Sequence, residues 1–129
     1  MPAQGKEEVK VTRKEQTLIH DERQKIQAIL GKVMAAILAG DHEKAAREAR
    51  NAGMKNPAKV ILKNLGLLFR IPCGMKKKGF ALHKDFDRFA ELLEKEETTQ
   101  GEALSFLSTN LMTERCSTCH SKYRLKVIA

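Results

Sequence analysis

The sequence has no tryptophan and one tyrosine, and aromatic residues make up only 5% of its 129 residues. So few aromatic side chains offer no platform on which the bases of a nucleic acid could stack. The chain also lacks any run of about eighteen apolar residues, which a membrane-spanning helix would need. Residues 1–13 are polar and charged and contain no apolar region typical of a signal peptide. We therefore expect neither nucleic-acid binding nor a membrane span.

Alanine, leucine, lysine and glutamate dominate the composition, which favours helices over sheet. The 24 lysines and arginines exceed the 16 aspartates and glutamates, so the formal net charge is +8. This excess suits acidic partners or anionic surfaces. No group of acidic and basic residues suited to substrate turnover is visible, so we do not expect an enzyme.

The spacing of apolar residues predicts helices over most of the chain, because such residues recur every three or four positions. Gly40 would end the first helix and Asp41 would cap the second. Thr98 or Thr99 would cap the last helix, which leads into the C-terminal segment. The predicted helices cover about residues 12–39, 41–51, 75–95 and 99–120, with a loop containing a buried helical segment at 54–73.

Four amphipathic helices joined by short loops predict an all-α fold, an antiparallel four-helix bundle. Residues 12–129 would form this single domain, and residues 1–11 would be a flexible N-terminal tail. In such a bundle the first and last helices lie side by side. Residues 16–30 should therefore face the C-terminal end of the last helix.

That end carries the sequence Cys116-Ser-Thr-Cys119-His120. Cys-x-x-Cys-His is the attachment pattern of a c-type haem, in which two thiols bond to the porphyrin and the histidine binds the iron. Positions i, i+3 and i+4 of a helix share a face, so all three side chains can meet one flat ligand. The sequence predicts one covalent haem c near the C-terminus, with His120 as the proximal iron ligand.

Two other interpretations of the cysteines remain open. A zinc site could combine Cys73, Cys116 and Cys119 with one histidine, although no second closely spaced ligand pair exists. That site would make the chain a zinc-stabilised helical interaction module. A redox-active thiol pair of the thioredoxin type would need a βαβ pattern, and none is visible.

The last helix presents one conflict. If it is an unbroken α-helix, Leu107 and Leu111 point nearly opposite to Cys116 and His120. Either the haem occupies a cleft separate from the apolar core, or the helix is slanted so that both faces are covered. Met112 precedes Cys116 by about one turn and should pack against the edge of the porphyrin.

The motif continues as His-x-x-Tyr-Arg, and this C-terminal arrangement resembles the class II c-type cytochromes, the cytochrome c′ family. Residues 38–41 are similar to the first interhelical turn of that family, and residues 79–86 are similar to the start of its third helix. The resemblance covers about residues 15–126. It implies a periplasmic, often dimeric protein that transfers electrons or binds gases.

Side chains of the first helix would cover the open face of the iron. Six-coordinate relatives place a methionine there, but residues 16–30 contain none. His20 is the candidate distal ligand, and its alternative role is an exposed histidine at the rim. Arg23 could pair with a haem propionate or gate the pocket, or it could be a solvated arginine without a role in the site. Gln27 and Ile26 are the other candidates.

Several further residues are expected to have structural roles. Tyr123 and Arg124 would fix the chain beyond the motif, Arg124 through a propionate. His83 should point inward and be hydrogen-bonded, and Met34 should pack in the core. Lysines 76–78 should be solvated.

Single-electron transfer through one covalently attached haem is the predicted function, with the excess of lysine and arginine steering the protein to acidic redox partners. The alternative is a five-coordinate haem protein that binds a small gas, NO or CO. Because covalent haem attachment requires export, we expect a periplasmic protein whose signal peptide has been removed, and the family resemblance suggests a homodimer.

Overall fold

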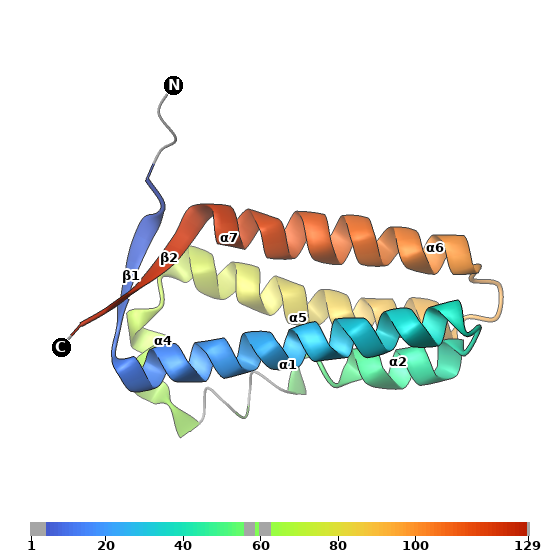
Figure 1. Cartoon of the computed structure of the whole chain (residues 1–129), viewed down its shortest axis with the longest axis horizontal. Helices are drawn as coiled ribbons and strands as arrows, with labels where there is room; N and C mark the ends of the chain where they lie inside the picture. The colour runs from blue at the N-terminus through green and yellow to red at the C-terminus, as the bar shows by residue number, and fades with distance from the viewer. Residues whose placement is uncertain (1–4, 56–58, 60–62, 129) are drawn as a thin grey trace.

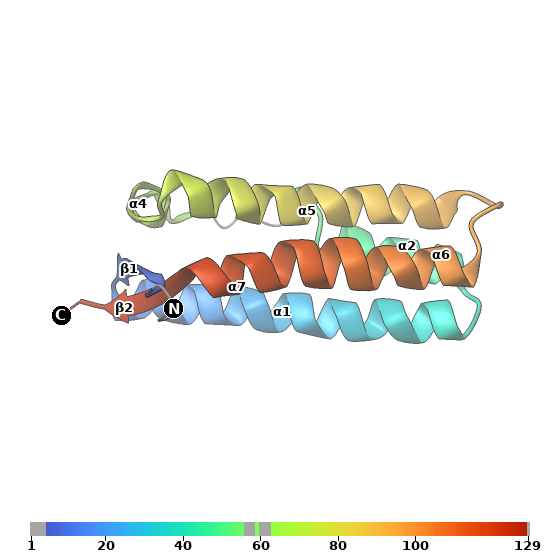
Figure 2. The same cartoon turned by 90° about the horizontal axis from the view of Figure 1, so that it is seen from above.

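The chain is mostly helical, as its composition predicts. The computed structural model describes residues 5–55, 59 and 63–128. In chain order the described elements are β1 (Glu7–Val11), α1 (Arg13–Leu38), α2 (His42–Arg50), α4 (Leu65–Arg70), α5 (Cys73–Glu94), α6 (Gln100–Ser105), the π-helix η1 (Phe106–Ser117), α7 (Thr118–Lys122) and β2 (Tyr123–Val127). The elements α6, η1 and α7 form one continuous rod, which lies beside α1 and α5 along the length of the molecule (Figures 1 and 2).

Side-chain caps fix where the helices begin, and those of α2 and α6 lie where the sequence predicts them. Thr12 and Glu15 form a capping box at the start of α1, with the Glu15 N–H donating to Thr12 Oγ1 at 3.1 Å and the Thr12 N–H donating to Glu15 Oε1 at 2.8 Å. Gly40 follows α1 with a φ of 78°, a left-handed conformation that glycine adopts without strain. Asp41 and Thr99 cap α2 and α6 through their side-chain oxygens.

The main apolar core joins α1, α2, α5 and the C-terminal rod. Phe89 of α5 stacks on Phe106 at the start of η1, with ring centroids 5.2 Å apart. The largest completely buried side chains of this core are Ile37, Phe86, Phe89, Leu107 and Leu111. Because α2 is short and these residues lie toward α2 and α6, the opposite half of the molecule is packed separately, around a second apolar cluster.

The sequence predicts a loop with a buried helical segment at residues 54–73. The structure describes the helix α4 within this stretch. Leu67 is its buried residue, whereas Phe69 is 82% exposed. Residues 56–58 and 60–62, where the buried segment was expected to begin, lie outside the described residues. The neighbouring helix α5 begins two residues earlier than the predicted residue 75 and ends within one residue of the predicted end.

Residues 7–11 do not form the flexible tail that the sequence predicts. They form β1, which pairs in parallel with β2, so that Val9 lies opposite Leu125 and Val11 lies opposite Val127. Val9 and Val11 are buried and alternate with exposed charged residues, the pattern of a half-buried strand. They pack on Leu67 in a second apolar cluster. The two ends of the chain therefore close the same end of the molecule (Figure 1).

The π-helix η1 resolves the conflict in the last helix. Its backbone hydrogen bonds join residues five apart rather than four, and the Ser117 hydroxyl likewise donates to the Met112 carbonyl at 3.1 Å. A π-helix turns through a smaller angle per residue than an α-helix, so residues four and five positions apart lie on one face. Leu107 and Leu111 can therefore be buried in the core while Cys116 still lines the interior face of the rod.

Candidate functional site

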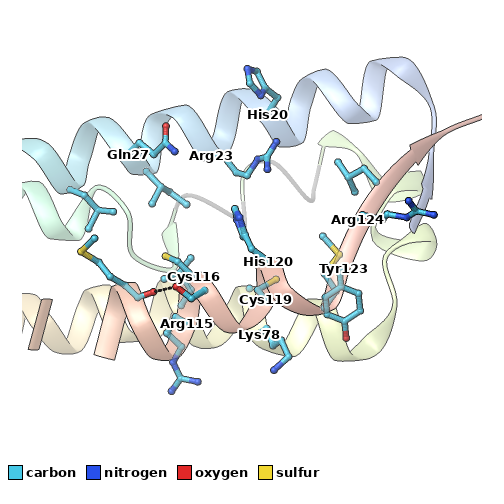
Figure 3. A pocket seen from close by; sticks show the side chains of 18 of the residues that line it. His20, Arg23, Gln27, Lys78, Arg115, Cys116, Cys119, His120, Tyr123 and Arg124 are labelled. Atoms are coloured by element: carbon cyan, nitrogen blue, oxygen red, sulfur yellow. Dashed lines mark hydrogen bonds between the residues drawn. The ribbon is translucent and has the colours of Figure 1, made fainter. Parts of the chain in front are cut away.

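A cavity of about 1130 Å³ lies between α1 and the C-terminal rod, toward the end closed by β1 and β2. Its walls come from residues 16–30 of α1, 108–120 of η1 and α7, 75–82 of α5 and 123–125 of β2. Pockets for small ligands span roughly 300–1,000 Å³, so this cavity has room for a large cofactor. Figure 3 shows part of its lining.

Every site residue that the sequence predicts lines this one cavity. They come from three separate parts of the chain, which the fold brings together. These residues are His20, Arg23, Gln27, Met112, Cys116, Cys119, His120, Tyr123 and Arg124. Ile26, a further candidate on the first helix, lines the cavity as well, and so does Met75 of α5.

Cys116 and Cys119 lie at the junction of η1 and α7 with half-buried thiols. Burial raises the pKa of the Cys116 thiol, and the neighbouring Cys119 raises it further. Burial also raises the pKa of Cys119, partly offset by the positive charge of Lys78. Both thiols are therefore protonated at neutral pH. A redox-active pair needs a lowered thiol pKa, so these shifts argue against that interpretation.

His120 follows directly on α7, and its ring extends across the cavity toward α1 (Figure 3). Arg23 and His20 of α1 are both exposed. Arg23 lies on the side of α1 nearer to His120, and His20 points away from His120 on the other side of the α1 ribbon (Figure 3). This orientation does not favour His20 as a distal ligand and matches its alternative role at the rim. Gln27 lies one turn after Arg23 on the same wall.

The cavity is strongly positive. Its lining includes the five cationic side chains Lys6, Arg23, Lys78, Arg115 and Arg124, and no aspartate or glutamate among the described residues. Arg124 is paired with Glu8 of β1 rather than lying free for a propionate. Of residues 76–78, predicted to be solvated, Lys77 is exposed, whereas Lys76 and Lys78 are half-buried. Such a lining suits a ligand that carries negative charge.

Sequence reasoning missed the ion pair that fixes the wall beside Cys116. Asp85 of α5 is 4% exposed, and its carboxylate accepts a hydrogen bond of 2.5 Å from Arg115 Nε on η1. Arg88 lies 3.7 Å from the other carboxylate oxygen. The pair joins residues 30 positions apart, and nothing local in the sequence marks them as partners.

A second missed contact holds the end of the motif. The Tyr123 hydroxyl lies directly against Gly74, so closely that a Cβ atom at position 74 would collide with it. The absence of a side chain at Gly74 lets the start of α5 approach β2. The predicted role of Tyr123 in fixing the chain beyond the motif stays a prediction, and this contact is where it would act.

Other predicted structural roles have mixed outcomes. His83 is hydrogen-bonded as predicted, its Nδ1 lying 2.6 Å from the Ala52 carbonyl oxygen. The core position predicted for Met34 is wrong, because the residue is 40% exposed. The buried stripe of α1 runs through Val33 and Ile37 instead, and Met34 lies at its edge.

The zinc alternative gains no support from the geometry. Cys73 is exposed and is not part of the cavity lining. Within the described ranges, no three His, Cys, Asp or Glu side chains gather closely enough to hold a metal ion. A three-cysteine site would require Cys73 to reach Cys116 and Cys119.

Two further observations bear on what the chain is. Among the described residues, none of the helices combines the length and the apolar character that crossing a bilayer requires. Comparisons with models of known protein families, with curated proteins and with solved structures find no match to this chain.

Proposed function

We propose that the cavity holds one haem c, bonded through thioethers to Cys116 and Cys119, with His120 as an axial ligand of the iron. The observation that carries this proposal is that both thiols and the imidazole line a single cavity, whose described lining has five cationic side chains and no carboxylate. A haem carries two propionates, so it matches both the size of the cavity and its charge. When bound, it supplies a one-electron redox couple.

The protein's own groups have distinct tasks in this site. The Cys116 and Cys119 thiols would hold the haem, each adding its sulfur to one carbon of a vinyl group and its proton to the other, so that attachment would consume no oxidant. The Asp85–Arg115 pair joins the C-terminal rod to α5 beside these thiols. Met112 and Ile26 provide apolar cover, as the sequence suggests for the porphyrin edge.

The proposed role is single-electron transfer. His120 is exposed, so the bound group would lie close to the surface at α7, where an electron can leave. The net charge of +8 would steer the protein to acidic redox partners. The wider hypothesis is an antiparallel four-helix bundle of the cytochrome c′ type, periplasmic and paired as a homodimer.

Binding of a small gas is the second candidate function, and the orientation of His20 favours it. Among the described residues, no methionine of α1 lines the cavity, and His20, which does line it, points away from His120 on the other side of the α1 ribbon (Figure 3). An iron without a firm sixth ligand is open to NO or CO.

The test is to express the chain behind an export signal together with haem-attachment enzymes. Mass spectrometry of the denatured protein should show one added haem. A double variant, Cys116→Ala with Cys119→Ala, should lose it, whereas the control Cys73→Ala should keep it. A change of the reduced spectrum on adding carbon monoxide would support gas binding, and an unchanged spectrum would support pure electron transfer. Free thiols in the exported protein would overturn the haem proposal.

A further inference from the structure

We propose that Arg23 makes the space between α1 and His120 a binding site for small inorganic anions, such as fluoride, azide or nitrite, on the open side of the iron. This inference rests on the haem site proposed above. It concerns a ligand class different from the neutral gases, and it is carried by the position and the charge of one side chain.

The first observation is position. Arg23 lies on the cavity side of α1, across from His120 of α7, whereas His20 lies on the other side of the α1 ribbon (Figure 3). A ligand held between α1 and His120 would therefore lie in the part of the cavity that Arg23 lines. The Gln27 side chain follows one turn later on the same wall and adds an amide donor.

The second observation is that the charge of Arg23 is available. Arg115 is paired with Asp85, and Arg124 is paired with Glu8. Arg23 forms no ion pair within the described part of the chain, and no described carboxylate lines the cavity. The protein therefore brings a cation to this position without neutralising it.

The chemistry of arginine determines which class of ligand should bind more tightly. A guanidinium stays protonated, so it cannot replace a missing iron ligand, but it presents several N–H donors in a fixed plane. Hydrogen bonds from such a cation to an anion are roughly twice as strong as those between neutral groups. Distal donors of this kind help decide which ligands a haem iron holds. Arg23 should therefore raise the affinity for an anion substantially and the affinity for a neutral diatomic gas only slightly.

The propionates are the competing partners for Arg23. Two other cations, Lys6 and Lys78, line the cavity and also lack an ion-pair partner among the described residues. Lys78 lies on the side of α7 away from α1 (Figure 3). The cavity thus has cations for the propionates besides the one that faces His120.

The experiment titrates fluoride into the ferric, haem-loaded protein and follows the absorption spectrum. Arg23→Met removes the charge and keeps much of the aliphatic stem. We expect it to raise the fluoride Kd about tenfold, since a hydrogen bond to a charged group contributes about 1.5–3 kcal/mol and 1.4 kcal/mol corresponds to tenfold. The control Lys32→Met removes an exposed charge of α1 outside the cavity lining and should change Kd less than about twofold. Lys78→Met, which removes a cavity cation elsewhere, should have a similarly small effect.

Carbon monoxide binding to the reduced protein supplies the second measurement. Arg23→Met should leave its affinity within about threefold, because the gas is uncharged. The inference is overturned if Arg23→Met leaves fluoride affinity unchanged, if Lys78→Met weakens it equally, or if fluoride and carbon monoxide lose affinity together, which would indicate a steric role. It is also overturned if the wild type binds no fluoride. A protein whose mass shows no covalent haem would instead overturn the proposed function on which the inference rests.

Discussion

Replacing Arg115 by methionine tests whether the buried carboxylate of Asp85 holds the haem-motif helix to α5. The substitution keeps the aliphatic packing of the arginine stem but removes the donor that lies 2.5 Å from a carboxylate only 4% exposed. Breaking a fully buried pair costs about 3–5 kcal/mol. Because the Arg115 side chain is 37% exposed and Arg88 remains 3.7 Å away, solvent and the second cation reduce the cost. We expect a loss of about 2 kcal/mol in the free energy of unfolding.

The assay is thermal unfolding of the haem-loaded protein, followed by far-ultraviolet circular dichroism. For a chain of this length each kcal/mol corresponds to about 3–5 °C, so Tm should fall by about 6–10 °C. The matched control is Arg88→Met, which removes the 73% exposed partner of the same carboxylate and should cost less than about 0.5 kcal/mol.

A double variant separates loss of the pair from loss of packing. Combining Asp85→Leu with Arg115→Met removes both charges, and it should recover most of the stability that Arg115→Met loses, because no buried carboxylate remains unpaired. If Arg115→Met is no more destabilising than Arg88→Met, the pair does not hold the helix and the reasoning is refuted.

Two further predictions concern the residues around the motif. Gly74→Ala places a Cβ against the Tyr123 hydroxyl and should lower the free energy of unfolding, measured in urea, by about 1–3 kcal/mol. Adding Tyr123→Phe removes the hydroxyl and should restore most of that loss. A double variant that is no more stable than Gly74→Ala would contradict the contact. In protein collected before haem attachment, Cys116 and Cys119 should react with iodoacetamide at pH 8 more slowly than a small-molecule thiol, since burial raises the pKa of both. The same shift stabilises the folded protein below the ordinary thiol pKa of 9.0, and this contribution is lost as the pH rises through the raised values. Faster alkylation than that of the free thiol would contradict it.

Local signals in the sequence predicted the helix boundaries well. Thr12, Asp41 and Thr99 each accept a hydrogen bond from the N–H group three residues later, so the pattern that creates each cap is contained in a few neighbouring positions. The sequence also predicted that the candidate site residues would meet. Helix length and spacing place residues 16–30 opposite the motif, and the candidate residues line one cavity.

Features that depend on distant partners were not predictable in this way. The strand β1 exists because Val9 and Val11 find β2 at the other end of the chain, and neither short segment signals its partner. The π-helix η1 has no local marker, although the mismatch between the apolar face at Leu111 and the motif at Cys116 indicated that an α-helix was insufficient.

The orientation of His20 shows the limit of helical periodicity. His20 and Arg23 are three residues apart, and both lie on the flank of the apolar stripe of α1. Spacing alone could not decide which of them turns toward the cavity. In the packed structure both side chains are exposed, with Arg23 on the cavity side of α1 and His20 on the other side of the ribbon (Figure 3).

The most direct measurement is the mass and the absorption spectrum of the exported protein after maturation with haem-attachment enzymes. The proposed site predicts the mass of the chain plus one haem, retained after denaturation, together with the spectrum of a haem bonded through two thioethers. A colourless protein of unmodified mass, with the Cys116 and Cys119 thiols free to react, would contradict it.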